Sequence, residues 1–210
     1  MKDELLDSET RLQFAGHETF PLRLLWLKKA HDAISEDGLS RRTFQEQEAI
    51  ARFGVGKNMA MSMRHWAVAA GMANPVGGTY HEPTEIARKI LDDSGLDPFL
   101  EKPATLWLIH ATLAGAPAPC TTFYYAFNLL NQAEFDREGL NQAILDLAKK
   151  RNARATAETV KRDVEVFLRS YVGRGSDASE DAAEPLLAEL GLLLDARLSG
   201  RYEFAWGPQP

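Results

Sequence analysis

The sequence predicts a mainly helical protein in which two helix-turn-helix-like units, each with a short β wing, surround a central pair of helices. Three observations support this prediction. Apolar side chains recur at helical spacing along most of the 210 residues, glycine and proline interrupt them at short intervals, and residues 103–132 are almost continuously apolar. A composition of 45% hydrophobic and 26% charged residues is that of a globular chain and excludes a wholly disordered or fibrous one.

The first half of the chain has the element order of a winged helix-turn-helix. Pro21 suits the first turn of a helix, where its missing N–H costs nothing. Thr43 and Glu46 have capping-box spacing, and Gly71 ends the helix that follows the turn. The expected elements are helices over 21–34, 43–53, 57–70 and 83–91, a turn over 54–56 and a hairpin over 74–80.

The second half repeats this order after the central pair, which residues 116–119 divide into two helices. Asp136 is placed to cap the next helix. The expected elements are helices over 136–151, 157–171 and 185–190, and a second wing from residues 192–193 and 201–206. These boundaries predict an N-terminal unit over 1–101, the central pair over 102–133 and a second winged unit over 134–210.

Carboxylates are missing from residues 49–81, although the chain as a whole has a net charge of -6. In proportion to the whole chain, such a window would hold about five. Its cations remain, so the window predicts a DNA-contacting surface in an otherwise anionic chain, because only the local potential meets a phosphate backbone. The predicted contact residues are Lys57, Asn58, Arg64 and His65, with Arg41 and Arg42 upstream.

The start of the helix after the turn is the centre of this predicted surface. Lys57 and Asn58 lie there, where free N–H groups and the positive end of the helix dipole favour a phosphate. Arg64 falls on the same face as Lys57 and could reach a base edge or the next phosphate. The alternative is a solvated face on a protein-interaction domain, since many winged helices bind only protein.

A second basic group lies in the second unit, where Lys161 and Arg162 come early on the equivalent helix. They are predicted to contact DNA as well. Acidic residues such as Glu158 interrupt this group, so ion pairing along the helix surface is an equal alternative.

Catalytic chemistry is best supported at His17, Glu18 and Arg23. A histidine moves protons near neutral pH, a carboxylate accepts a proton or holds a divalent ion, and an arginine neutralises a phosphate. Lys28 could join them at one helix N-terminus. The alternative is that His17 and Glu18 only cap that helix.

Two other groups of residues carry weaker signals. Asp92, Asp93, Asp97 and Glu101 could bind magnesium, but such a group is more typical of a solvated helix end. The single cysteine, Cys120, excludes a disulfide framework and is expected to be inert packing.

Several short motifs together resemble the DUF4007 family over nearly the whole chain, from about Phe14 to Pro208. They are FAGHETFPLR (14–23) with WLKK (26–29), GVGKNM (54–59) with RHW (64–66), PATLW (103–107), KRDV (161–164) and GRYEF (200–204). Members of this family are usually longer, so the chain is expected to be truncated at its C-terminus.

The resemblance implies a function in bacterial defence against phage. The family includes the B component of the Ssp system, which places phosphorothioate on one DNA strand, and that component is regarded as a DNA-nicking nuclease. The implied partners are duplex DNA, a cysteine desulfurase and an ATP-using sulfur-transfer enzyme. The resemblance supplies no catalytic motif, so His17, Glu18 and Arg23 rest on their chemistry alone.

The resulting expectation is a DNA nicking endonuclease that uses a divalent metal such as Mg²⁺ or a positioned general base. A noncatalytic DNA-binding adaptor and a protein-interaction scaffold of the same defence complex are the alternatives. No membrane span is expected, because no apolar run approaches about 20 residues. The polar, acidic N-terminus is not a targeting segment, which indicates the cytoplasm.

Overall fold

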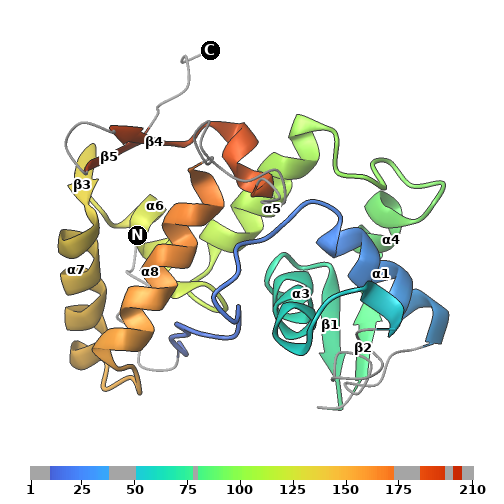
Figure 1. Ribbon diagram of the computed structural model, residues 1–210, viewed down its shortest axis with the longest axis horizontal. Helices are drawn as coiled ribbons and strands as arrows, with labels where there is room; N and C mark the ends of the chain where they lie inside the picture. Colours follow the sequence, from blue (N-terminus) through green and yellow to red (C-terminus); the bar gives the residue numbers. More distant parts are fainter. Residues whose placement is uncertain (1–9, 38–50, 78–79, 173–184, 197–200, 205–210) are drawn as a thin grey trace. The chain divides into compact units, whose positions relative to one another are not determined.

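The computed structural model describes residues 10–37, 51–77, 80–172, 185–196 and 201–204. These residues are mainly helical and include two small antiparallel sheets (Figure 1). The chain divides into two compact units, one formed by residues 16–112 and the other by residues 1–15 with 113–210. The predicted central helical pair is shared between them, because the division falls inside its first helix.

The unit of residues 16–112 is built around two helices that pack against each other, α1 (Trp26–Asp37) and α3 (Lys57–Ala69). A hairpin of β1 (Ala73–Val76) and β2 (Tyr80–Pro83) follows α3, as predicted, with Val76 opposite Tyr80. The helix α4 (Glu85–Leu91) packs on α1, and α5 (Pro103–Gly115) completes the order. Its core contains the fully buried Leu22, Leu27, Met63 and Trp66.

The expected start of the first helix at Pro21 is wrong, because α1 begins at Trp26. Leu25 has a left-handed backbone (φ 65°), which a continuous helix cannot contain. The segment before it is held in another conformation by the Phe20 carbonyl, which accepts a hydrogen bond from Trp66 Nε1 at 3.0 Å. A contact from a distant helix therefore overrides the local preference of proline.

The junction between α3, the hairpin and α4 depends on Gly71 and Thr84. Gly71 has φ 70°, the left-handed conformation that ends a helix and that glycine adopts without strain. The Thr84 hydroxyl donates to the Gly71 carbonyl at 2.8 Å and accepts from Ala87 N–H at 3.1 Å, so it caps α4. This side chain thus fixes both ends of the hairpin against the two helices.

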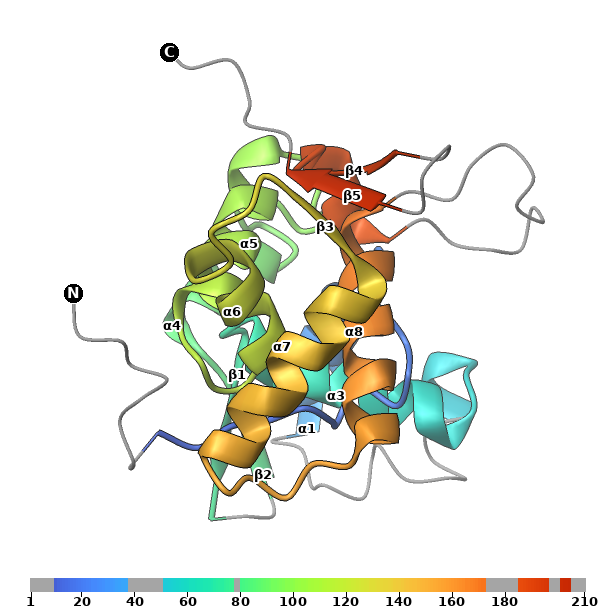
Figure 2. The same ribbon diagram turned by 90° about the vertical axis from the view of Figure 1, so that its left-hand side faces the viewer.

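The other unit contains α6 (Thr121–Asn128), α7 (Arg137–Lys150), α8 (Ala157–Tyr171) and the 3-10 helix η3 (Leu186–Leu190). Three strands, β3 (Glu134–Asp136), β4 (Leu193–Ala196) and β5 (Arg201–Phe204), form an antiparallel sheet in the order β3-β5-β4. Figure 2 shows α7 and α8 side by side, with these strands gathered at one end of the pair. The strand β3 was not predicted.

Aromatic rings and local caps hold this unit together. Phe127 and Tyr171 lie 4.9 Å apart between ring centroids, and Phe123 and Phe167 lie 5.3 Å apart. The helix starts are fixed by side chains, because Asp136 accepts from Gly139 N–H at 2.7 Å, as predicted. Thr156 caps α8 in the same way.

Some expectations concern residues outside the described ranges. These are the capping box at Thr43 and Glu46 and the predicted DNA contacts Arg41 and Arg42. Among the helices that the structure describes, none is both long enough and apolar enough to cross a bilayer.

Candidate nucleic-acid interface

Among the described residues, no side chain caps the backbone donors in the first turn of α3, which lie beside an exposed cation. Gly56 is the N-cap residue and has no side chain to accept from the first N–H groups of the helix. Lys57 and Asn58 are exposed, and the first turn contains no acidic residue. A helix start with free N–H groups and a lysine is suited to bind an anion such as a phosphate.

Arg64 extends this surface along α3. It lies seven positions after Lys57, which places both on one side of the helix, and it is partly exposed. No Asp or Glu occurs in α3 or in the other described residues from Ala51 to His81. This segment of the chain therefore contributes cations and no carboxylate to the surface, although the net charge of the chain is -6.

His65 lies roughly a quarter of a turn around α3 from Lys57 and Arg64, and its ring is unsuited to contact a phosphate. Its ring packs against Trp66 (5.1 Å between centroids) and His17 (5.9 Å), and its Nε2 is buried without a hydrogen-bond partner among the described residues. Burial, with smaller electrostatic contributions from the neighbouring His17 and Arg64, lowers the pKa of His65 to about 3. The imidazole is therefore neutral at pH 7 and neutralises no phosphate.

His17 belongs to a tight turn that precedes α1, and its side chain is 5% exposed. The backbone N–H of Thr19 donates to His17 Nδ1 at 3.1 Å, and Phe20 N–H donates to the His17 carbonyl at 2.9 Å. Because a backbone N–H can only donate, Nδ1 must be unprotonated, and a neutral His17 carries its proton on Nε2. The lone pair that a general base would use is thus engaged in the turn.

Glu18 and Thr19 both have left-handed backbones, with φ 47° and 66°. This conformation is uncommon for residues other than glycine and costs roughly 1–3 kcal/mol where it is sparsely populated. His17 accepts two hydrogen bonds in this turn, one at Nδ1 from Thr19 N–H and one at its carbonyl from Phe20 N–H. These bonds hold Glu18 and Thr19 in the left-handed conformation. Such strain is often found at functional sites, which keeps this turn a candidate.

Arg23 follows the turn that contains His17 and Glu18, which closes at Phe20. Its guanidinium carbon lies 5.5 Å from the centre of the Phe20 ring and 5.4 Å from that of Trp26, within cation–π distance. Lys28 makes different contacts, since its ammonium binds Asp32 and Asp93. Of the four residues predicted to cluster, His17, Glu18 and Arg23 lie in one short segment. Lys28 lies in a different pocket, where it pairs with two aspartates.

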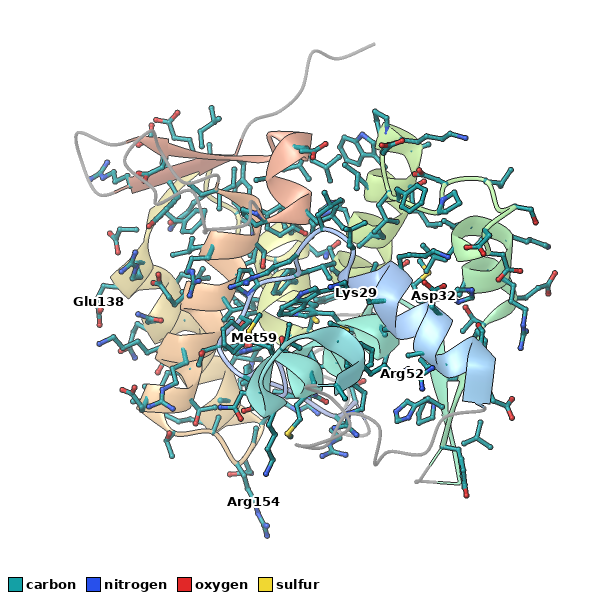
Figure 3. All side chains as sticks on the ribbon, turned by 45° about the vertical axis from the view of Figure 1, so that its right-hand side comes forward. Lys29, Asp32, Arg52, Met59, Glu138 and Arg154 are labelled. Atoms are coloured by element: carbon teal, nitrogen blue, oxygen red, sulfur yellow. The ribbon has the colours of Figure 1, made fainter. Side chains whose placement is uncertain are left out.

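The Lys28 pocket, as we name it, has a volume of about 400 Å³ and is lined by Lys28, His31, Asp32, Ser35, Asp92 and Asp93. The Lys28 Nζ lies 2.7 Å from both Asp32 Oδ1 and Asp93 Oδ1. His31 Nε2 lies 2.7 Å from Asp92 Oδ1. Figure 3 shows Asp32 on the side of α1 that lies nearest α4. Sequence reasoning missed this pocket, for which only the i, i+4 spacing of Lys28 and Asp32 gave a local signal.

The predicted acidic group is divided by the structure. Asp92 and Asp93 line the Lys28 pocket, whereas Asp97 accepts from the N–H groups of Glu101 (2.9 Å) and Lys102 (3.0 Å). Burial alone would raise the pKa of Asp97, but these bonds and one from Thr105 lower it. Asp97 is therefore a structural carboxylate that orders the turn before α5.

A divalent metal does not fit the described residues as they stand. Among them, no three His, Cys, Asp or Glu side chains are placed to hold an ion together. Aspartate oxygens are the ligands that Mg²⁺ prefers, but in the Lys28 pocket the ammonium already bridges two of the three carboxylates. A metal ion could therefore enter this pocket only by displacing the Lys28 ammonium.

The second predicted basic surface is weaker than the first. Lys161 and Arg162 are exposed on α8, but Arg162 Nε lies 3.0 Å from Glu158 Oε1 in an i, i+4 pair. The alternative of ion pairing along the helix is confirmed for Arg162. Arg154, which lies in the loop before α8, projects into solvent (Figure 3).

The tautomer of His17 leads to a testable ranking of variants. In His17→Asn the amide oxygen takes the position of Nδ1 and still accepts from Thr19 N–H, whereas in His17→Gln it lies one bond farther out. We expect the Asn variant to be more stable by roughly 1 kcal/mol, measured by urea unfolding at neutral pH. Glutamine fills more of the volume of the ring, so a more stable Gln variant would contradict the role given to Nδ1.

Comparisons with known proteins place this chain in a family. It belongs to the DUF4007 family, since the model of that family, described as a protein of unknown function, matches residues 14–210. A search of curated protein sequences found no significant match.

Two solved structures of SspB are similar to the chain. One is the crystal structure of magnesium ion-bound SspB, with a TM-score of 0.82 and 29% sequence identity. The other is a crystal structure of SspB with a TM-score of 0.84 and 30% identity. Each comparison covers 97% of this chain and 63% of the SspB chain, so this chain spans less than two thirds of the SspB length.

Proposed function

We propose that this protein binds duplex DNA through Lys57, Asn58 and Arg64 of α3 and acts in a DNA phosphorothioation defence system like the one that its DUF4007 relatives imply. The observation that carries the proposal is the first turn of α3, where N–H groups that no described side chain caps and an exposed lysine occur in a helix without carboxylates. Phosphate contacts of this kind supply most of the affinity for duplex DNA.

The order of elements supports a winged helix-turn-helix in both units. In the second unit the order is α6, β3, α7, α8, η3, β4 and β5. Apart from η3, this order and the sheet order β3-β5-β4 are those of a three-stranded winged helix. In the first, helical residues 51–53 lead through a glycine turn into α3 and the β1–β2 hairpin. In this interpretation α3 takes the place of the recognition helix in the major groove.

The proposal extends to nicking of one DNA strand, with residues 17–23 as the reactive segment. In the hydrolysis, water adds to phosphorus, one P–O bond to a sugar breaks, and the departing oxygen takes up a proton. Glu18 would accept the proton of the attacking water, and Arg23 would oppose the charge that develops on the phosphoryl oxygens. His17 is a positioning residue here, because its Nδ1 is held by Thr19 N–H.

Nicking of supercoiled plasmid, with and without Mg²⁺, tests this proposal. We expect relaxed circles from the wild type and a loss of about 100-fold or more in Glu18→Gln. Glu82→Gln, which neutralises an exposed carboxylate on β2, is the matched control and should nick like the wild type. Wild-type rates in Glu18→Gln would remove Glu18 from the reaction.

A noncatalytic DNA-binding adaptor is the second candidate, and the burial of His17 favours it. Because the chain spans 63% of the SspB length, the region of SspB outside the match is another place where nicking could reside. In that case the wild type would bind duplex DNA without producing relaxed circles in any divalent metal. The same plasmid assay, paired with a binding measurement, separates the two candidates.

A further inference from the structure

The turn between α7 and α8 concentrates cations in a chain that is anionic as a whole. Residues 149–154, which we name the basic turn, contain four cations, and no Asp or Glu occurs from residue 147 to residue 157. The whole chain has 30 acidic and 24 basic residues. The four cations are Lys149, Lys150, Arg151 and Arg154.

Two of these cations are available to a ligand. Lys150 and Arg154 are exposed, and their side chains make no ion pair or hydrogen bond with the residues that the structure describes. Figure 3 shows Arg154 extending away from the ribbon. Arg151 is instead used inside the fold, because its guanidinium donates to the Thr10 carbonyl at 2.8 Å.

The backbone of the basic turn is fixed by the end of α7. Asn152 has a left-handed backbone (φ 49°), which asparagine tolerates better than most residues. Its N–H donates to the Lys149 carbonyl at 3.0 Å, and Ala153 N–H donates to the Ala148 carbonyl at 2.9 Å. These are the two bonds of a Schellman motif. The backbone that carries the two available cations is therefore ordered before a ligand binds, which lowers the entropic cost of binding.

Other exposed arginines of the same unit are already paired with carboxylates. These pairs are Arg137 with Glu165 (3.3 Å), Arg162 with Glu158 (3.0 Å) and Arg201 with Glu134 (3.4 Å). In the basic turn only Lys149 approaches a carboxylate, that of Asp146, at 3.8 Å. A paired cation must give up its carboxylate to bind a phosphate, whereas Lys150 and Arg154 give up only water and counterions.

We propose that the basic turn binds the phosphate backbone of duplex DNA through Lys150 and Arg154, as a second contact besides α3. Apart from Arg154, residues 152–156 are asparagine, alanine and threonine, which offer no large apolar side chain for the core of a protein interface. Exposed lysine and arginine side chains are typical phosphate contacts. The inference rests on the proposed function for its ligand, but its contact residues lie in the other unit.

Fluorescence anisotropy of a labelled duplex, measured with the 210-residue chain, tests the proposal. We expect Lys150→Ala/Arg154→Ala to weaken binding by roughly tenfold to thirtyfold. The slope of log affinity against log salt concentration should fall by about two. The exchange Lys150→Arg/Arg154→Lys keeps both charges and should bind nearly like the wild type. Thermal unfolding should give the alanine variant the Tm of the wild type, since neither side chain contacts a described residue.

Two further variants separate this proposal from its alternatives. Arg88→Ala/Lys89→Ala removes one arginine and one lysine from α4, and an equal loss of affinity there would overturn the proposal in favour of an effect of net charge. If Lys57→Ala/Arg64→Ala weakens binding and the basic-turn variant does not, the proposal fails while the α3 interface stands. The converse result would support the basic turn and overturn the α3 interface, and a wild type that binds no duplex would overturn both.

Discussion

Replacement of Lys57 and Arg64 by alanine is expected to weaken binding to duplex DNA by roughly tenfold to a hundredfold. Each side chain is placed to neutralise one phosphate, and exposed contacts of this kind contribute about 1 kcal/mol apiece, so that two of them amount to a factor of roughly 30. The slope of log affinity against log salt concentration should fall by about one for each lost contact. Fluorescence anisotropy of a labelled duplex at several salt concentrations measures both quantities.

The matched control removes the same charges from another surface of the same unit. Arg88 and Lys89 are exposed on α4, and Arg88→Ala/Lys89→Ala also loses one arginine and one lysine. We expect this variant to bind nearly as tightly as the wild type. Equal losses in the two double variants would mean that net charge, and not the face of α3, determines binding.

Acid is expected to destabilise the protein through His65. The pKa of His65 is about 3 in the folded chain and about 6.5 in an unfolded one. The unfolded chain therefore takes up a proton that the folded chain does not as the pH falls from 6.5 toward 3. The His65 contribution to the free energy of unfolding is complete above pH 6.5 and declines by roughly 1.4 kcal/mol for each pH unit below it.

Substitution of His65 isolates this contribution from that of the carboxylates. His65→Gln should lose less stability than the wild type when urea unfolding is compared at about pH 7 and about pH 5, with a difference of roughly 2 kcal/mol. The groups that face His65 are His17, from the turn, and Arg64, from its own helix. If the wild type and the variant lost stability in parallel, the neutral, buried state of His65 would be wrong.

Elements with local signals could be predicted from the sequence. The helices α3 and α8 begin at Lys57 and Ala157, as expected, and Asp136 caps α7, because glycine turns and caps act over three or four residues. The strand β3 and the start of α1 could not be predicted in this way. The strand β3 forms because β5 pairs with it. The start of α1 is displaced by the hydrogen bond that Trp66 donates to the Phe20 carbonyl.

In the candidate site, too, the features with a local sequence signal could be predicted, and those that depend on distant contacts could not. The absence of carboxylates near Lys57 and Arg64 is visible in the sequence, and the structure leaves both side chains at least partly exposed. Helical spacing alone did not show that the His65 ring is packed against its neighbours, because that depends on His17 and Trp66. The Lys28 pocket joins residues 65 positions apart, which no local pattern records.

Photocrosslinking from the start of α3 tests the central claim most directly. Asn58→Cys keeps Lys57 and Arg64 and accepts a photoreactive label, while the native Cys120 is buried, and burial together with the charge of Asp163 raises the pKa of its thiol. We predict efficient crosslinking of the label at position 58 to a bound duplex, and little from a label on Lys89→Cys. Crosslinking from position 89 alone, or none from position 58 when the duplex is bound, would contradict the proposed interface.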